Sequence, residues 1–211
     1  MLAAACGLIG LPYGVLADSA GLTMAQAVAL SVFTFAGSSQ FAYVSVVGGG
    51  GNPAVAVGGA LLLAARNAFY GPVVTPLLRG GAFRLAVAAQ FLTDETTAMA
   101  SAQDDPTDAR DAFWFTGLAI MSLWVAGTVA GVLLGGNLDD PSAWGLDAAF
   151  PAAFVALLVP HVETRAGRVT ALTGAVIALV AVPITPAGAP ILLAALAVGP
   201  GMAVANRRMP L

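Results

Sequence analysis

The stretch Phe35-Ala36-Gly37-Ser38-Ser39-Gln40 places small and polar side chains inside an otherwise apolar run from residue 22 to residue 47. A lipid-immersed helix satisfies its own backbone hydrogen bonds, and polar side chains at mid-depth face protein or a water-filled cavity instead of lipid tails. The interruption therefore predicts a solute-binding site, with Gly37, Ser38, Ser39 and Gln40 as its contacts.

Composition assigns the chain to the integral membrane proteins. Of its 211 residues, 59% are hydrophobic and 9% are charged, whereas a soluble domain carries roughly 25% charged residues. Apolar runs long enough to cross a bilayer, which takes roughly 20 residues, recur along the sequence. We therefore expect an all-α polytopic membrane protein with a single transmembrane domain over residues 1–211. The net charge of −3 does not indicate nucleic-acid binding.

The apolar segments predict about six or seven transmembrane helices, of which one or two are broken or re-entrant. Residues 2–17 and 83–100 are the expected broken segments, although residues 2–17 are equally compatible with a plain first span. Because each precedes a pair of fuller spans, an internal repeat stays open. The fuller spans are expected at residues 22–47, 53–78, 113–134, 148–159, 169–182 and 191–205.

Arginines predict the orientation of these spans in the membrane. All eight basic residues are arginines, and several follow span ends: Arg79, Arg84, Arg165, Arg168, Arg207 and Arg208. Loops rich in basic residues lie on the cytoplasmic side. We therefore expect the C-terminus in the cytoplasm.

Charged residues interrupt two of the apolar segments. Arg66 and Asn67 lie near the middle of residues 53–78, and Asp94 and Glu95 lie at the centre of residues 83–100. A charge at that depth costs at least ~2.5 kcal/mol, so Arg66 is expected to pair with Asp94 or Glu95. The acid that stays unpaired becomes a candidate proton carrier. A water-exposed loop or helix cap is the alternative interpretation of both acids.

Two other functional classes are weighed against a transporter. Gly51-Asn52-Pro53-Ala54-Val55 is similar to an aquaporin Asn-Pro-Ala box, which makes a channel for water or small neutral solutes the alternative function. Only one copy occurs, at a span boundary. An enzyme would need a nucleophile with a base, or a metal with several ligands, and His161 and Cys6 are the single residues of their kinds. No enzyme activity, cofactor or metal is expected, and Trp124 is interpreted as a packing or interfacial aromatic.

Three motifs follow one another along the chain: Phe35 to Phe41, Arg66-Asn67 with Tyr70, and Leu92 to Thr96. In this order and spacing they resemble the AzlC family of branched-chain amino acid exporters. Gly10-Leu11-Pro12-Tyr13-Gly14 is similar to the family's Pro-Phe-Gly opening, with Tyr13 in place of Phe. Leu146-Asp147, Pro151 and Phe154 resemble its Leu-Asp-Phe-x-x-Pro-x-x-Phe stretch. Ala68 stands where the family often has His, and Ala148 stands where it usually has an aromatic.

The resemblance implies a secondary transporter that exports Val, Leu, Ile and in some members Met, coupled to proton entry. It also implies a small membrane partner of the AzlD type and a location in the cell membrane of a prokaryote. Self-association into a homo-oligomer stays open. The residues that we expect to carry the function are Gly37, Ser38, Ser39, Gln40 and Asn67 as substrate contacts, and Arg66, Asp94 and Glu95 for ion pairing or proton coupling.

Overall fold

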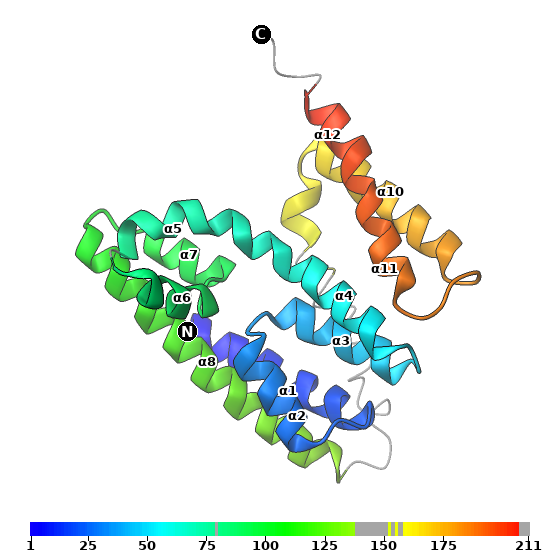
Figure 1. The fold of residues 1–211 in the computed structure, drawn as a ribbon, viewed down its shortest axis with the longest axis horizontal. Helices are drawn as coiled ribbons and strands as arrows, with labels where there is room; N and C mark the ends of the chain where they lie inside the picture. The colour runs from blue at the N-terminus through cyan, green and yellow to red at the C-terminus, as the bar shows by residue number, and fades with distance from the viewer. Residues whose placement is uncertain (79, 138–151, 153–154, 156–157, 207–211) are drawn as a thin grey trace.

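A computed structural model describes residues 1–78, 80–137, 152, 155 and 158–206 of the chain (Figure 1). Every regular element in these residues is a helix, and they contain no strand, which confirms the predicted all-α class. Three described segments are long and apolar enough to cross a membrane, namely Leu2–Ser19, Pro53–Leu78 and Pro106–Gly135. Most of the expected span 148–159 lies outside the described residues, as do Arg79, Arg207 and Arg208.

The first segment is one continuous helix, α1 (Leu2–Ser19), so it is the plain span that the sequence left open, and the expectation that it is broken was wrong. Pro12 lies inside it without ending it. The helix packs along α8 (Pro106–Gly135), where glycines of the two helices meet backbone to backbone. A Cβ atom on Gly131 would collide with Leu11 O of α1. Small residues allow such close approach of two membrane helices, so the glycines of α8 form a groove for α1.

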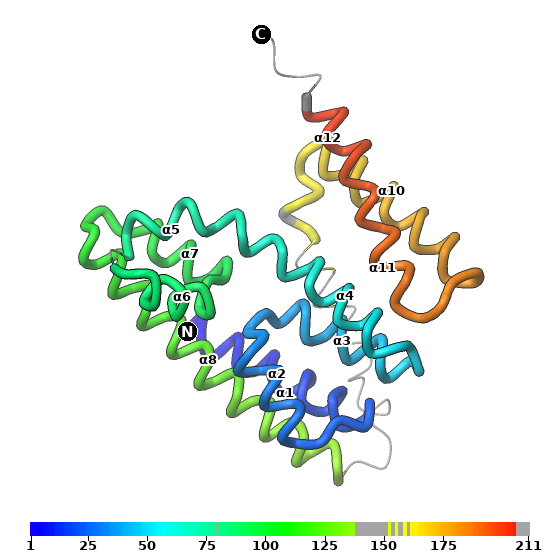
Figure 2. The backbone as a smooth tube through the Cα atoms, viewed as in Figure 1, coloured from blue at the N-terminus to red at the C-terminus, as the bar shows by residue number. Residues whose placement is uncertain are grey.

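The predicted span 22–47 is not one helix but two, α2 (Met24–Phe33) and α3 (Gly37–Gly48). Phe35 adopts a φ of 34°, a left-handed conformation that a helix cannot contain. The chain then reverses, since a Cβ atom on Gly48 would lie 3.2 Å from Cβ of Ala20, just before α2 begins. The pair therefore forms a re-entrant hairpin, whose turn is visible in the blue part of the tube in Figure 2.

The next span is the rod α4 (Pro53–Ala64), η1 (Ala65–Tyr70) and α5 (Gly71–Leu78), in which the helix tightens to a 3₁₀ form at its middle. Asn52 caps its start by accepting a 2.8 Å hydrogen bond from Ala54 N. A stretch of 3₁₀ helix inside a longer helix often marks a functional hinge. This one contains Arg66 and Asn67.

Residues 83–100 are broken, as the sequence predicts, into α6 (Ala82–Gln90) and α7 (Asp94–Ser101). The two broken pairs meet at their tips. Gln90 Nε2 donates a 2.6 Å hydrogen bond to Val32 O, and the rings of Phe35 and Phe91 meet edge to face with centroids 5.8 Å apart. Figure 1 shows α5, α6, α7 and the start of α8 gathered at one end of the bundle, with α3 and the start of α4 toward the other end.

The C-terminal part forms a separate antiparallel group in Figure 1. It consists of η3 (Val159–Val162), α10 (Arg165–Ala181), α11 (Ala189–Ala194), η4 (Ala195–Ala197) and α12 (Val198–Asn206). A Cβ atom on Gly188, just before α11, would lie 2.8 Å from Cγ1 of Val46 and 2.9 Å from Cγ1 of Val55, so this group contacts the α3–α4 region. The outward faces are apolar, with Leu179 74% exposed. Such faces suit a lipid environment.

Candidate functional site

A cavity of about 300 Å³ lies where the tips of the two broken pairs meet η1, α1 and α8. It therefore sits near the middle of the long helices. Its wall is mostly apolar with a few polar and charged groups, the usual character of a small-molecule site. The residues that line it are Cys6, Ile9, Phe35, Ala36, Gly37, Ser38, Gln40, Phe41, Arg66, Asn67, Thr93, Asp94, Glu95, Ile120 and Trp124.

One polar side of the cavity is the N-terminus of α3. The N-cap residue Ala36 has no side chain that could accept a hydrogen bond, and none caps this helix. The first N–H groups of a helix have no acceptor within the helix itself. Ser38 lies beside them, nine-tenths buried, and its Oγ has no partner. This end of the cavity therefore offers unused hydrogen-bond donors.

Gln40 lines the cavity, but both ends of its amide are occupied. Its Oε1 accepts a 2.9 Å hydrogen bond from Trp124 Nε1, and its Nε2 donates to Leu30 O at 3.3 Å. The Trp124 ring lies against Gly37, where an added Cβ would come within 2.8 Å of it. Trp124 is thus a wall residue of the site that sequence reasoning missed. The only local signal was Gly37, whose missing side chain leaves room for the ring.

Ser39 does not line this cavity. It is fully buried with an unpartnered Oγ, and it lines a second cavity of about 580 Å³ between α2, α3 and α4. On a helix, consecutive residues point in different directions. The structure therefore brings Gly37, Ser38, Gln40 and Asn67 of the predicted substrate contacts together and places Ser39 elsewhere.

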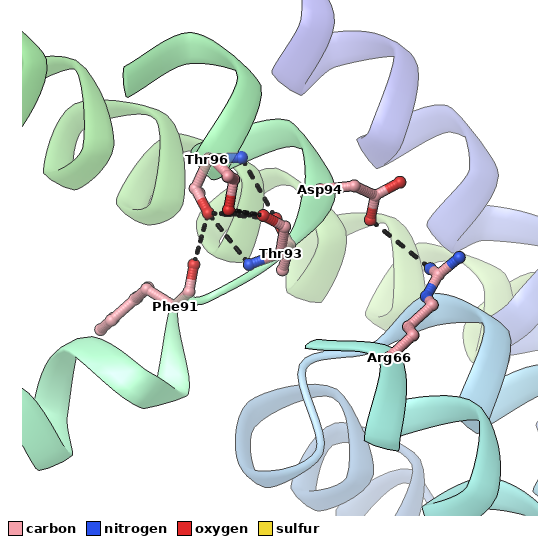
Figure 3. Close-up of polar contacts among 6 residues, drawn as sticks. Arg66, Phe91, Thr93, Asp94 and Thr96 are labelled. Atoms are coloured by element: carbon pink, nitrogen blue, oxygen red, sulfur yellow. Dashed lines mark hydrogen bonds and ion pairs between the residues drawn. The ribbon is translucent and has the colours of Figure 1, made fainter. Parts of the chain in front are cut away.

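The charged side of the cavity is formed by η1 and the first turn of α7. Arg66 Nη2 lies 3.5 Å from Asp94 Oδ1, and both side chains are about 40% exposed (Figure 3). An ion pair this open to solvent contributes only ~0–1 kcal/mol to folding. Glu95 lines the same cavity and has neither a hydrogen bond nor an ion pair among the described residues. Asn67 Oδ1 is buried without a partner.

The local fold of α7 explains why the two acids stand side by side at the cavity. Thr93 caps α7 by accepting a hydrogen bond from Thr96 N, and Thr96 Oγ1 also donates to Phe91 O at 2.8 Å (Figure 3). This capping box fixes the start of the helix, so that Asp94 and Glu95 form its first turn. The positive end of the helix dipole stabilises carboxylates there.

The remaining candidates that the structure describes are not among the lining residues of the cavity. Asn52 of the Asn-Pro-Ala stretch is a helix cap at the end of the α3–α4 connection and is not among the lining residues. His161 lies in η3, also outside the lining set. Asp147, Ala148, Pro151 and Phe154 lie outside the described residues. No group of three or more potential metal ligands occurs among the residues that the structure describes.

Long apolar helices, two broken helices that meet tip to tip, and a cavity lined by their ends define a membrane transport protein. In such proteins discontinuous helices typically place the solute near mid-membrane. The chain belongs to the AzlC family: the family described as AzlC protein matches residues 2–138, which contain α1 to α8 and every residue of the cavity.

The chain is also similar to membrane proteins of three organisms. The chain is 26% identical to an uncharacterized membrane protein of Helicobacter pylori over 82% of its length and 76% of that protein. It is 30% identical to an uncharacterized membrane protein of Archaeoglobus fulgidus over 80% and 74% of the two chains. It is 26% identical to the branched-chain amino acid transport protein AzlC of Bacillus subtilis over 79% and 66%. No solved structure matches the chain.

Proposed function

We propose that the chain is a secondary transporter that exports Val, Leu, Ile and also Met, with the cavity between the two broken helices as its substrate site. The observation that carries the proposal is the lining of that cavity. Unpaired donors on α3 and an unpaired carboxylate on α7 face a mostly apolar space of about 300 Å³. A small apolar amino acid needs this combination, and the volume is at the low end of ligand pockets, ~300–1,000 Å³.

Family membership supports the same substrate class. The Bacillus subtilis relative is named a branched-chain amino acid transport protein. The region that matches the AzlC family, residues 2–138, includes the whole cavity. The apolar part of the lining comes from Ile9, Phe35, Phe41, Ile120 and Trp124. Such a wall favours aliphatic side chains over charged ones, because burying an unpaired charge is costly.

We further propose that Glu95 carries the coupling proton. Arg66 lies beside Asp94, whereas Glu95 has no partner among the described residues. The other titratable or charged groups that line the cavity are Cys6 of α1, Arg66 of η1 and Asp94 of α7. A carboxylate that gains and loses a proton in the cavity can link proton entry to amino acid exit.

A small membrane partner of the AzlD type completes the proposed transporter. The span Pro53–Leu78 supports this, since only 11% of its most apolar window is buried within the chain. Phe69, 80% exposed, and Leu61, 65% exposed, belong to its open face. A partner helix or lipid can cover such a surface, and the resemblance to AzlC proteins favours the partner.

The test is counterflow of labelled leucine in proteoliposomes, with the chain alone and with its candidate partner. Saturable exchange is expected, and empty liposomes give the background. Gly37→Ala should lower exchange at least tenfold, because its Cβ would displace the Trp124 ring that Gln40 holds. Gly58→Ala is the matched control, because its Cβ meets Leu192 at an ordinary 3.8 Å.

A proton gradient separates coupling from binding. Glu95→Gln should abolish gradient-driven accumulation at every leucine concentration and keep counterflow measurable at high leucine concentration, whereas Asp94→Asn should keep some accumulation. Absence of leucine exchange in both preparations, together with rapid osmotic swelling, would show a channel and overturn the transporter.

A further inference from the structure

The two polar sides of the cavity are chemically opposite. On one side, the N-terminus of α3 has no cap and the buried Ser38 Oγ has no partner. On the other side, α7 is already capped by Thr93 and presents Glu95, a carboxylate without a partner among the described residues. Donors therefore face the cavity from α3, and an acceptor faces it from α7.

The charges of the residues that line the cavity add to this difference between its two sides. Arg66 Nη2 and Asp94 Oδ1 lie 3.5 Å apart, and the two charges neutralise one another. Because Glu95 has no such partner in the described part of the chain, the residues that line the cavity carry one excess negative charge. The N-terminus of a helix acts as roughly half a positive charge and binds carboxylates through its N–H groups. A zwitterion matches both features in one orientation only.

Resting on the function proposed above, we infer that α3 and α7 hold opposite ends of the amino acid. The substrate carboxylate accepts hydrogen bonds from the N–H groups of Gly37 and Ser38 and from Ser38 Oγ. The substrate ammonium lies at Glu95. The side chain then points to the apolar wall that includes Ile120 and Trp124, so Arg66 is not the carboxylate anchor.

Cys6 provides a binding measurement that does not depend on transport. It is the single cysteine of the chain and lines the cavity. A bound ligand should slow its alkylation by a small maleimide. The probes are L-leucine, L-leucinol, which lacks the carboxylate, and 4-methylpentanoate, which lacks the ammonium. Protection is titrated with each probe, and the concentration for half-protection is compared between variants.

Ser38→Ala should raise the half-protecting concentration of leucine about tenfold and leave that of leucinol within twofold, because a hydrogen bond to a charged group is lost only with leucine. Glu95→Gln should weaken the binding of leucine and of leucinol but not the binding of 4-methylpentanoate. Ser39→Ala is the matched control, since this buried serine lines the other cavity. Each ratio between probes is taken within one variant, so it does not depend on the amount of folded protein.

The outcomes separate this inference from the proposed function. Leucine that neither protects Cys6 nor exchanges in the unmodified protein would overturn both. Leucine exchange with an unchanged leucine-to-leucinol ratio in Ser38→Ala would overturn the carboxylate position alone. If Glu95→Gln changes the half-protecting concentration of 4-methylpentanoate more than that of leucinol, the substrate is bound in the reverse orientation and the ammonium position is overturned.

Discussion

Trp124 Nε1 donates a 2.9 Å hydrogen bond to Oε1 of Gln40, and the two residues are 84 positions apart in the chain. Since Gln40 Nε2 also donates to Leu30 O, one amide ties α8, α3 and α2 together. Gln40 is 1% exposed and Trp124 is 8% exposed. The glutamine therefore holds the cavity wall in place, with one N–H and its carbonyl oxygen engaged within the protein.

Gln40→Ala should destabilise the fold by about 1–3 kcal/mol, because it leaves the buried Trp124 N–H unsatisfied. In a Trp124→Phe background the same substitution should lower the free energy of unfolding by clearly less, because the indole N–H that would lose its acceptor is absent. Unfolding in detergent, followed by circular dichroism, measures both values. Equal costs in the two backgrounds would show that the hydrogen bond contributes nothing to stability.

Gly131→Ala should loosen the packing of α1 on α8. Its Cβ would collide with Leu11 O and lie 2.9 Å from Gly14 Cα, and both are backbone atoms. Overpacking of this kind typically costs ~1–3 kcal/mol. The midpoint of thermal unfolding in detergent should therefore fall. Gly199→Ala in α12, which meets no atom within 4 Å, should leave the midpoint unchanged or raise it, and an equal fall in both would contradict the packing argument.

Asp105 should make the stability of the protein pH-dependent through the start of α8. Its Oδ1 accepts hydrogen bonds from Thr107 N at 2.7 Å and Asp108 N at 3.3 Å. These bonds hold the pKa of Asp105 below its usual range. Because the pKa of Asp105 is lower in the folded state, its charged carboxylate stabilises the folded state fully above the unfolded pKa of ~3.9. This stabilisation is lost as pH falls through the folded pKa.

Asp105→Asn, which keeps an accepting oxygen but no charge, isolates this contribution. The stability difference between the unmodified protein and this variant should be constant near neutral pH and shrink on acidification. Unfolding measured between pH 7 and pH 3 tests it. Asp104→Asn serves as the control, because Asp104 accepts no hydrogen bond among the described residues. A difference that grows as pH falls would contradict the cap.

The orientation in the membrane follows from the two ends of α8. Gln103 precedes this helix and Asn137 follows it, and both are exposed. The 30-residue helix is about 45 Å long at ~1.5 Å per residue, enough to cross a bilayer. Arg84 and Arg110 mark the Gln103 end, so that end should face the cytoplasm. In a Cys6→Ala background, Asn137→Cys should react with an impermeant maleimide in whole cells, and Gln103→Cys should react only after lysis.

Much of the fold was predictable from the sequence because its signals are local. Thr23 and Gln26 form a capping box, and Pro53 lies in the first turn of a helix; both are signals carried by a few neighbouring residues. The glycines at four-residue spacing in α8 form a face on which α1 packs. The acids in the middle of residues 83–100 predicted a broken helix there. These features depend on residues within one or two helical turns of one another.

The break near Phe35 could not be predicted from neighbouring residues alone. Residues 22–47 were interpreted as one span because their apolar run is long enough to cross a bilayer, yet a left-handed Phe35 turns the chain back. The conformation is costly for a non-glycine residue. Contacts distant in sequence accompany it: the ring of Phe35 meets Phe91, and Gln90 donates to the carbonyl of Val32.

By itself, the sequence determined the membrane class, the helical fold, the family and the polar positions from which a site could be built. Composition, periodicity and short motifs encode these properties directly. Only the tertiary structure decided which polar groups share a cavity. Ser38 lines it, whereas Ser39 lines the second cavity. Asp94 pairs with Arg66, and Trp124 forms part of the cavity wall. Adjacent residues on a helix point in different directions, and contacts between helices far apart in the chain determine which direction faces the cavity.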